Sequence, residues 1–308
     1  MKTHLSDEAK GMIAASAAYV IFGFSYLFSK MALNVTEPLI LLCCRFTLTF
    51  ITLNFLVLTG ICRISLKGKN LLLPVLVGLV QPCLYFILEN YGLSYTTTAF
   101  TGMISSVSPI FTAILGAVVL KEKLSIRQWL FVLVSIAGVA MVSVGGSGGK
   151  NTVAGCVCLV AAYLSGSLYS LMIRRFSRVF TPFELTYVMF SVGFVFFAVM
   201  TFSAYRGAAL TMMREALGHA DFIVPVIYLG VGASVVAYFL ANYSLSKLPV
   251  ARSTIFTNLS TLVSVVSGII IMGDPFGPLS VAAFALMLLG IWGVNRFRAA
   301  DETAAGKK

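Results

Sequence analysis

One stretch of the sequence occurs twice. Residues 90–122, NYGLSYTTTAFTGMISSVSPIFTAILGAVVLKE, return in degenerate form as residues 242–274, NYSLSKLPVARSTIFTNLSTLVSVVSGIIIMGD. The spacing is kept without a gap, and the matched residues are Asn90/Asn242, Tyr91/Tyr243, Leu93/Leu245, Ser94/Ser246, Ala99/Ala251, Ser108/Ser260 and Gly116/Gly268, with Gly78/Gly230 upstream and Gly138/Gly290 downstream. The chain is therefore expected to fold as two related halves.

The repeated unit has the composition of a membrane segment. Hydrophobic residues make up 59% of the chain, charged residues only 11%, and the mean hydropathy is +0.96. A soluble chain carries about a quarter charged residues. The apolar stretches are continuous and about 20 residues long, which predicts membrane-spanning helices rather than a barrel.

Apolar spans can be placed along the whole chain. We count ten, at 11–30, 38–60, 71–94, 97–119, 125–145, 152–174, 182–204, 222–246, 250–272 and 278–297. Each half holds an odd number of spans, so the halves must be inverted relative to each other in the bilayer. We therefore expect an all-α integral membrane protein with ten transmembrane helices in two inverted-topology five-helix repeats. The first repeat is expected at 1–146, the second at 147–298, and a disordered cytoplasmic tail at 299–308.

The first span has a repeat partner as well, at a different offset. The matched residues are Gly11/Gly155, Ala18/Ala162, Tyr19/Tyr163 and Pro38/Pro182. Residues 11–29 are therefore interpreted as a retained span rather than a signal peptide, because no cleavage site follows them. The change of offset comes from extra residues in 206–221, where we predict a short interfacial helix.

Lys and Arg are distributed unequally between the connecting segments. With the N-terminus inside, sixteen lie in inside segments and four in outside segments. The four outside are Lys30, Lys150, Arg206 and Arg214. Positive residues favour the cytoplasmic side, so both termini are predicted to be cytoplasmic in the cell (plasma) membrane. The net charge of +11 follows from these orientation signals and does not indicate nucleic-acid binding.

Hydroxyl side chains form a stripe at helical spacing in each copy of the repeat. The stripes are Thr101, Ser105, Ser108 and Thr112, and Ser253, Thr257, Ser260 and Ser264. One interpretation is helix packing, because Ser and Thr allow helices to approach closely. The other is the lining of a cavity at the interface between the halves, where inverted-repeat transporters bind solute. The match between the two stripes favours the cavity.

The first span of each half presents a polar and aromatic face. Tyr19, Gly23, Tyr26 and Lys30 follow one another at helical spacing, and their counterparts are Tyr163, Ser167, Ser170 and Arg174. Such a face suits a cavity for an organic solute, although tyrosines that pack between helices would give the same pattern.

Two opposite charges lie inside the apolar spans of the first half. Arg45 and Glu89 are both about 10 Å below the outer surface at 1.5 Å per residue. A lone charge at this depth is costly, so we expect an ion pair between them. Alternatively, Glu89 faces the cavity on the same side as Pro82 and Tyr85 and binds the solute or a coupling proton. The second half has Met189 and Ala241 at the matching positions, so the charges are asymmetric.

Three further charges stand near span ends. Arg252 either extends to the cytoplasm or collects anions at the inner mouth of the cavity. Glu122 and Asp274 are expected to be water-exposed carboxylates at helix ends.

The expected cavity lining combines these patterns. It comprises Tyr19, Gly23, Tyr26, Tyr85, Glu89, Thr101, Ser105, Ser108, Tyr163, Ser167, Ser170, Thr257 and Ser260, with Arg45 and Glu89 as structural or coupling charges.

Several positions resemble a known family. They are Arg45 within LLCCRFTLTF, the Tyr91-Gly-Leu-Ser-Tyr motif that opens the repeated stretch, Pro109, and Lys121-Glu122-Lys-Leu at its end. With ten spans in two inverted halves, the chain resembles the EamA-domain members of the drug/metabolite transporter superfamily. In the second copy Thr261 replaces the proline, and Asp274 with Pro275 replaces Glu122 with Lys123.

The resemblance implies a secondary membrane transporter rather than an enzyme. We expect export of a small polar or amphipathic metabolite, amino-acid-like or drug-like, by alternating access. The expected partners are this solute and the lipid bilayer, with protons as a possible coupling ion, no nucleic acid, and a monomer or weak dimer. The alternatives are a membrane-embedded scaffold or sensor, or an enzyme without transport activity.

Neither a cofactor nor a metal is expected. The only histidines are His4 and His219, and the cysteines lack the paired spacing of a zinc or redox site. There is no Walker motif and no HExxH motif.

Overall fold

The structure is a computed structural model that describes residues 6–119, 125–145, 151–176, 179–249 and 256–305. Every regular element in these ranges is helical. The elements are α1 (Asp7–Leu33), α2 (Pro38–Leu58), α3 (Leu72–Gly78), the π-helical segment η1 (Leu79–Leu84), α4 (Tyr85–Ser94), α5 (Thr98–Ser105), α6 (Ser108–Val119), α7 (Ile126–Gly145), α8 (Val153–Phe176), α9 (Pro182–Tyr205), α10 (Ala208–Ala216), α11 (Ala220–Ile227), the π-helical segment η3 (Tyr228–Ala237), α12 (Tyr238–Lys247), α14 (Thr257–Met272) and α15 (Pro278–Ala305).

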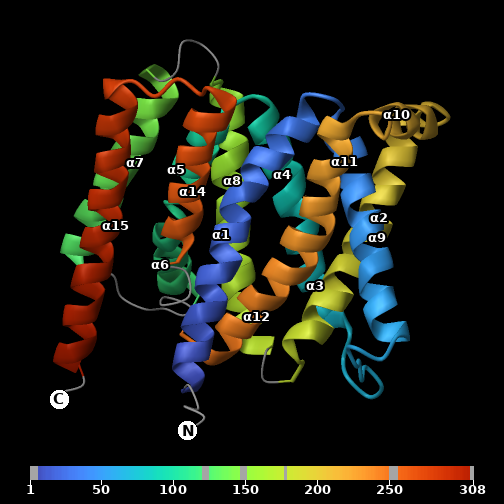
Figure 1. The fold of residues 1–308 in the computed structure, drawn as a ribbon. Helices are drawn as coiled ribbons and strands as arrows, with labels where there is room; N and C mark the ends of the chain where they lie inside the picture. Colours follow the sequence, from blue (N-terminus) through green and yellow to red (C-terminus); the bar gives the residue numbers. More distant parts are fainter. Residues whose placement is uncertain (1–5, 120–124, 146–150, 177–178, 250–255, 306–308) are drawn as a thin grey trace, which may run out of the picture.

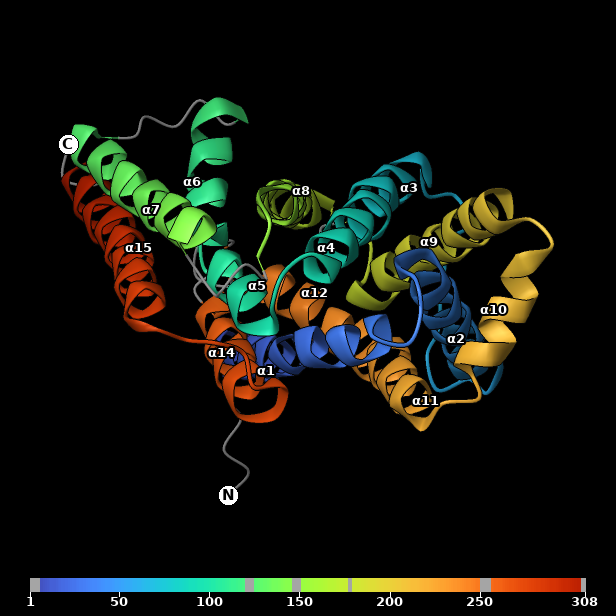
Figure 2. The same cartoon turned by 90° about the horizontal axis from the view of Figure 1, so that it is seen from above.

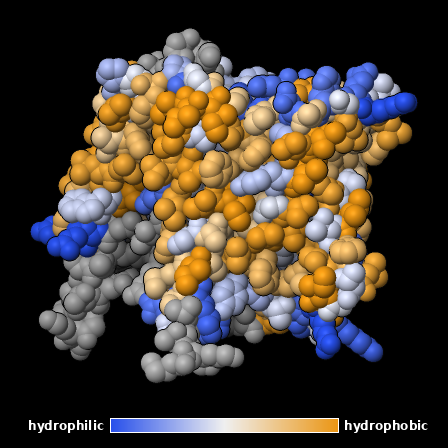
Figure 3. Space-filling model, viewed as in Figure 1, coloured by the Kyte–Doolittle hydropathy of each residue, from blue (hydrophilic) through white to orange (hydrophobic). Residues whose placement is uncertain are grey.

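The helices have the length and surface of membrane spans. Seven helical stretches in the described ranges are long and apolar enough to cross a bilayer, and three shorter apolar helices lie at 126–141, 257–272 and 278–294. α1 begins and α15 ends at the same end of the bundle (Figure 1). Apolar side chains cover most of the face seen in Figure 3, and the hydrophilic ones gather towards its two ends. Lipid is the solvent that such a surface requires.

Three boundaries agree with the sequence, and one differs. Pro38, Pro182 and Pro278 each begin a helix, where the missing N–H of proline has no cost. α15 continues to Ala305, so residues 299–305 are helical although we expected a disordered tail. This extension contains four alanines, which have the highest helix propensity.

The predicted short helix after α9 is present as α10. It lies at the end of the bundle away from the chain ends (Figure 1). Ala209 and Ala216 are buried against the bundle, while Leu210 is 65% exposed. An apolar side chain exposed at this level suits the boundary between lipid and water.

Helices of residues 7–145 pack mainly against helices of residues 153–305. α1 packs on α12 and α14, and α8 packs on α4 and α6. α2 lies against α9 and α7 against α15. Figure 2 shows the α7–α15 pair at one edge, with α1, α4, α5, α8, α12 and α14 gathered nearer the centre.

The matched glycines Gly138 and Gly290 lie where α7 and α15 cross. A Cβ atom on Gly138 would lie 2.8 Å from the carbonyl oxygen of Ala283, and one on Gly290 would lie 2.6 Å from Cβ of Ser135. Neither distance leaves room for a side chain. The repeat thus places a small residue on each helix at the same crossing.

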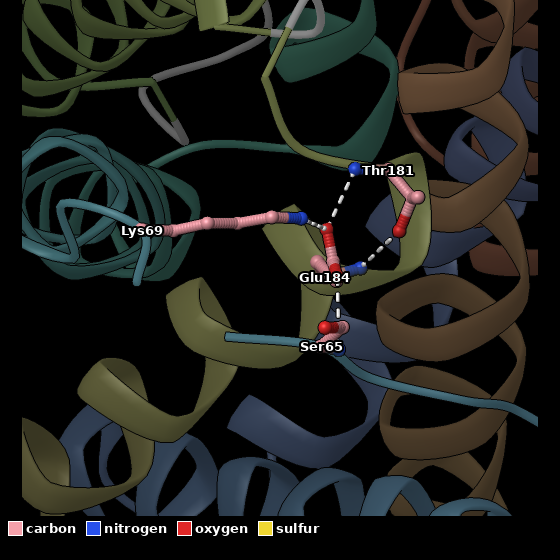
Figure 4. Close-up of polar contacts among 4 residues, drawn as sticks. All are labelled: Ser65, Lys69, Thr181 and Glu184. Carbon is pink, nitrogen blue, oxygen red and sulfur yellow. Dashed lines mark hydrogen bonds and ion pairs between the residues drawn. The ribbon is translucent and has the colours of Figure 1, made fainter. Parts of the chain in front are cut away.

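A buried carboxylate joins the α2–α3 loop to the start of α9 (Figure 4). Glu184 is 2% exposed. One of its oxygens accepts a hydrogen bond from the backbone N–H of Ser65 at 2.9 Å, and the other accepts from Lys69 Nζ at 2.6 Å and from the N–H of Thr181 at 2.9 Å. The Thr181 hydroxyl accepts in return from the N–H of Glu184, which completes a capping box. A single side chain therefore fixes both a helix start and a loop from the other half.

We expect Glu184→Ala to destabilise the protein by about 2 kcal/mol, because it removes the capping box and leaves the N–H of Ser65 without its partner. Thermal melting of the purified protein in detergent measures this effect. Glu37→Ala is the matched control, since Glu37 also stands at a helix start but makes no side-chain cap bond. Equal melting temperatures for the two variants would contradict the role of Glu184.

Candidate functional site

A cavity of about 100 Å³ lies between the two halves. Its lining comes from α1, α2, η1, α4, α5 and α6 of the first half and from α8, α12 and α14 of the second. The lining residues are Tyr19, Phe22, Ser25, Tyr26, Arg45, Gln81, Tyr85, Phe86, Glu89, Ser105, Ser108, Thr112, Tyr163, Gly166, Ser167, Tyr169, Ser170, Tyr238, Ala241, Leu245, Thr257 and Ser260. Eleven of the thirteen residues expected from the sequence are among them, together with Arg45.

The lining follows the repeat. Sixteen of its residues form eight pairs of matching positions: Tyr19/Tyr163, Phe22/Gly166, Ser25/Tyr169, Tyr26/Ser170, Phe86/Tyr238, Glu89/Ala241, Ser105/Thr257 and Ser108/Ser260. The same positions of both halves therefore face one space.

Two expected lining residues lie outside the cavity. A Cβ on Gly23 would lie 2.8 Å from the carbonyl oxygen of Ser260, so Gly23 lets α1 and α14 approach closely. The Thr101 hydroxyl donates to the carbonyl of Thr97 at 3.0 Å, and the Thr101 carbonyl accepts from the Tyr163 hydroxyl at 3.1 Å. Gly23 packs helices, and Thr101 positions a tyrosine that does line the cavity.

Some residues of the two hydroxyl stripes line the cavity, and others hold helices together. Ser105, Ser108, Thr112, Thr257 and Ser260 line the cavity. Ser264 instead donates to the carbonyl of Thr98 at 3.0 Å, which binds α14 to α5. Ser253 lies outside the described residues.

Aromatic rings form much of the wall. Eight of the lining residues are Tyr or Phe. Several meet edge to face, with ring centroids 5.0 Å apart for Tyr85 and Phe86 and for Phe22 and Tyr238. Such a wall offers apolar surface to the hydrocarbon part of a solute and π faces to a cation.

Arg45 and Glu89 both line this cavity but do not form the ion pair we expected. Arg45 is 2% exposed and Glu89 is 5% exposed. The ion pairs of the described residues are Lys10–Asp7, Lys69–Glu184 and Lys247–Asp7. Arg45 Nε donates instead to the Ser234 hydroxyl at 2.9 Å, and its guanidinium carbon lies 4.1 Å from the centre of the Phe86 ring.

Glu89 likewise has a neutral partner. It accepts a hydrogen bond from the Tyr85 hydroxyl, one turn earlier, at 2.6 Å. The prediction of an ion pair used only the number of residues from the end of each span, which does not determine the side of the helix on which a side chain lies. Arg45 points towards η3 of the other half, and Glu89 points towards Tyr85. The cavity thus contains a guanidinium group and a carboxyl group that do not bond to each other.

Gln81 was missed by the sequence analysis. It lies at a break between two helical stretches, with extended backbone angles (φ −148°, ψ 115°) and Pro82 directly after it. The signal was present, because a proline inside a membrane span opens the helix and often marks a binding site. Tyr238 and Tyr169 were missed too, together with the residues at the matching positions, Phe86 and Ser25, which also line the cavity.

A set of polar bonds closes the α4–α5 turn, at the end of the bundle opposite the chain ends. Lys30 Nζ donates to the carbonyls of Leu93 at 2.8 Å and Thr96 at 2.6 Å. Asn151 accepts from the N–H of Thr97 at 2.9 Å, and Asp274 accepts from the N–H of Ala99 at 2.8 Å. Lys30 thus lies beyond the cavity face on which we expected it. Asp274 is half-buried at the start of α5 rather than exposed at its own helix end.

The remaining predicted charges cannot be placed. Arg252 and Glu122 lie outside the described residues, and so does the side chain of Arg174. Within the described ranges, no three His, Cys, Asp or Glu side chains lie close enough together to hold a metal ion.

Comparison with known proteins shows the same duplication. The model of the EamA-like transporter family matches the chain twice, at residues 9–144 and 153–296. The chain is 32% identical to "Uncharacterized transporter YcxC" of Bacillus subtilis (strain 168) over 94% of each chain. It is 24% identical to "Probable terminal-alkyne amino-acid exporter" of Streptantibioticus cattleyicolor over 75% of each chain. Among the solved structures that match, one crystal structure has a TM-score of 0.64 at 16% identity, over 93% of this chain and 98% of that one, which shows a shared fold.

Cysteine labelling tests whether the second stripe faces a cavity. In a background without native cysteines, we expect Thr257→Cys to react with a small, charged thiol reagent, because Thr257 lines the cavity. Ser264→Cys, two turns along the same helix but bonded to α5, should stay unreactive. Equal reactivity of the two variants, both folded, would remove the distinction between lining and packing.

Proposed function

Because the chain belongs to the EamA-like transporter family, we propose that it is a secondary transporter that exports a small amphipathic solute bearing both a positive and a negative group. An amino acid is the simplest solute of this class. The solute crosses by alternating access through the cavity between the halves. The observation that carries the proposal is the presence of Arg45 and Glu89, unpaired with each other, in one buried aromatic cavity.

The charges define the solute. A buried charge without a counter-charge is unfavourable in a low-dielectric site, so each one favours a solute group of opposite sign. The guanidinium of Arg45 matches a carboxylate in charge and geometry, and the Glu89 carboxylate matches an ammonium. A solute with both groups neutralises both residues at once, whereas a simple amine or a simple acid neutralises one.

The wall and one relative agree with this class of solute. The eight aromatic rings provide surface for an apolar side chain. The Streptantibioticus cattleyicolor protein is named as an amino-acid exporter.

The architecture we propose is ten membrane crossings in two inverted repeats, at 1–146 and 147–298. Three observations support it. The seven longer and three shorter apolar helices together make ten. The family model matches each half separately. The lining occurs as eight pairs of matching positions, as expected where a pseudo-two-fold axis passes through a binding site.

For orientation we propose cytoplasmic termini in the plasma membrane, in agreement with the Lys and Arg distribution. The closed α4–α5 turn then faces outward. A reporter fused after Lys308 should be cytoplasmic, and one inserted at Lys150 should be external. The reverse pattern at either site would exclude this topology.

The proposal is tested by counterflow of radiolabelled amino acids in proteoliposomes. We expect the native protein to exchange at least one amino acid. Glu89→Gln keeps a group that can accept from Tyr85 but removes the charge, so it should fold normally and lower counterflow about ten- to a hundredfold. Arg45→Lys keeps the charge but not the forked geometry, and should lower it less than Arg45→Gln does.

Glu37→Gln is the control for charge, because Glu37 stands outside the cavity at the start of α2. It should leave counterflow unchanged. Normal counterflow by folded Glu89→Gln and Arg45→Gln would show that the two charges do not bind the solute. Absence of exchange by the native protein across the amino-acid panel would exclude the proposed solute class.

A further inference from the structure

Gln81 has an unused hydrogen-bond acceptor inside the cavity wall. Its side chain is 94% buried, since only 6% is exposed, and it lines the cavity. Its Nε2 donates to the Tyr238 hydroxyl, which belongs to the other half. Its Oε1 is buried and has no hydrogen-bond partner in the part of the chain that the structure describes. Native proteins rarely leave a buried acceptor unpaired, so each instance calls for an explanation.

The backbone explains why this side chain is available. Gln81 has extended rather than helical angles, so the helix is interrupted where the polar side chain enters the wall. The amide group is held from one side by Tyr238. This arrangement fixes the amide in place and leaves its oxygen free.

Gly166 leaves space next to this oxygen. A Cβ atom on Gly166 would lie 3.5 Å from Gln81 Oε1 and 3.2 Å from the Tyr85 ring. The matching position in the other half is Phe22, whose ring also lines the cavity and lies 5.0 Å from that of Tyr238. The repeat therefore has a large side chain at one of the two matching positions and none at the position beside Gln81.

Gln81 is also separated from the buried acid. It precedes Glu89 by eight residues, and Tyr85 lies between the two: the Tyr85 hydroxyl donates to Glu89, and the Tyr85 ring borders the position next to Gly166 and Gln81 Oε1. A solute whose charged groups lie at Glu89 and Arg45 reaches Gln81 only with the far end of its side chain.

We propose that Gln81 Oε1 accepts a hydrogen bond from a hydroxyl or amide N–H at the far end of the solute's side chain, in the space left by Gly166. Gln81 and Gly166 thus determine specificity, selecting a long side chain with a terminal donor over an apolar one of the same size. This inference rests on the proposed function, since it needs the charged end of an amino acid at Arg45 and Glu89.

The test compares two amino acids that differ in a single group. 5-Hydroxynorvaline and norleucine have side chains of the same length, ending in a hydroxyl and a methyl group respectively. We expect counterflow by the native protein to favour 5-hydroxynorvaline about tenfold, because a site built for a donor rejects the analogue that lacks it. Gln81→Leu should abolish this preference, and Gln81→Met serves as a second, unbranched variant if Gln81→Leu does not fold.

Two further variants separate recognition from a structural role. Tyr238→Phe breaks the same hydrogen bond between the halves but leaves the Gln81 amide, so it should keep the preference even if both rates fall. Gly166→Ala adds a methyl group beside the oxygen and should slow 5-hydroxynorvaline more than alanine, which is too short to reach this space.

The counterflow rates of the three amino acids separate failure of this inference from failure of the proposed function. Equal rates for the two probes in the native protein, or a Gln81→Leu variant that lowers both rates by the same factor, would overturn the inference while alanine counterflow preserves the proposed function. A loss of preference in Tyr238→Phe equal to that in Gln81→Leu would assign Gln81 a structural role only. If alanine, norleucine and 5-hydroxynorvaline are all not exchanged, the inference fails together with the proposed function.

Discussion

The structure depends on one constraint, which is that polar groups inside a bilayer must find their partners within the protein. Several hydroxyls of the central helices meet it locally: Ser105 and Ser260 each donate to a carbonyl of their own helix one turn back, and Ser108 donates to the carbonyl of Ser105 at the end of α5. Helix ends meet it through residues far away in the sequence: Lys30 donates to the carbonyls of Leu93 at the end of α4 and of Thr96 after it, and Asp274 of the other half accepts from the N–H of Ala99. Against this background, Arg45, Glu89 and Gln81 stand out because all three line one cavity. Other buried atoms without a hydrogen-bond partner among the described residues, such as Asn90 Oδ1 and Asn258 Oδ1, belong to residues outside this lining.

The two halves share a scaffold but not its chemistry. At matching positions of the cavity lining, one half has Glu89 and the other Ala241, and one half has Phe22 and the other Gly166. Arg45 corresponds to Met189, which is buried away from the cavity. In the proposed mechanism, the related frames of the two halves allow two arrangements that a pseudo-two-fold axis relates, and the asymmetric lining orients the solute. The proposal thus assigns movement to the duplication and recognition to the differences between the copies.

Much of this was visible in the sequence, and what was missed has physical reasons. The repeat with constant spacing predicted which residues share a helix face, because residues three or four positions apart lie on the same side of an α-helix. Tyr19 and Tyr163 were found in this way. The same reasoning predicted that Lys30 lies on the cavity face, whereas Lys30 bonds to the α4–α5 turn beyond the cavity. It also predicted that Gly23 lines the cavity, whereas Gly23 packs against α14. The Arg45–Glu89 pair was wrong because depth says nothing about rotation around the helix axis. Gln81 depends on a break in the helix, where periodicity no longer applies.

The bonds of Glu184 have a consequence for how the molecule can be divided. Ser65 and Lys69 belong to the first half of the chain, but they are bound to a side chain of the second. The α2–α3 loop is therefore carried by α9 whenever α9 is displaced, and α2 and α3 also pack directly on α9. Packing and hydrogen bonds thus join α2, α3 and α9 into a unit drawn from both halves, and the boundary of this unit cuts across the repeat. In the proposed transport cycle, two distance labels placed on α2 and α9 would therefore report almost no change, although the two helices belong to different copies of the duplicated unit.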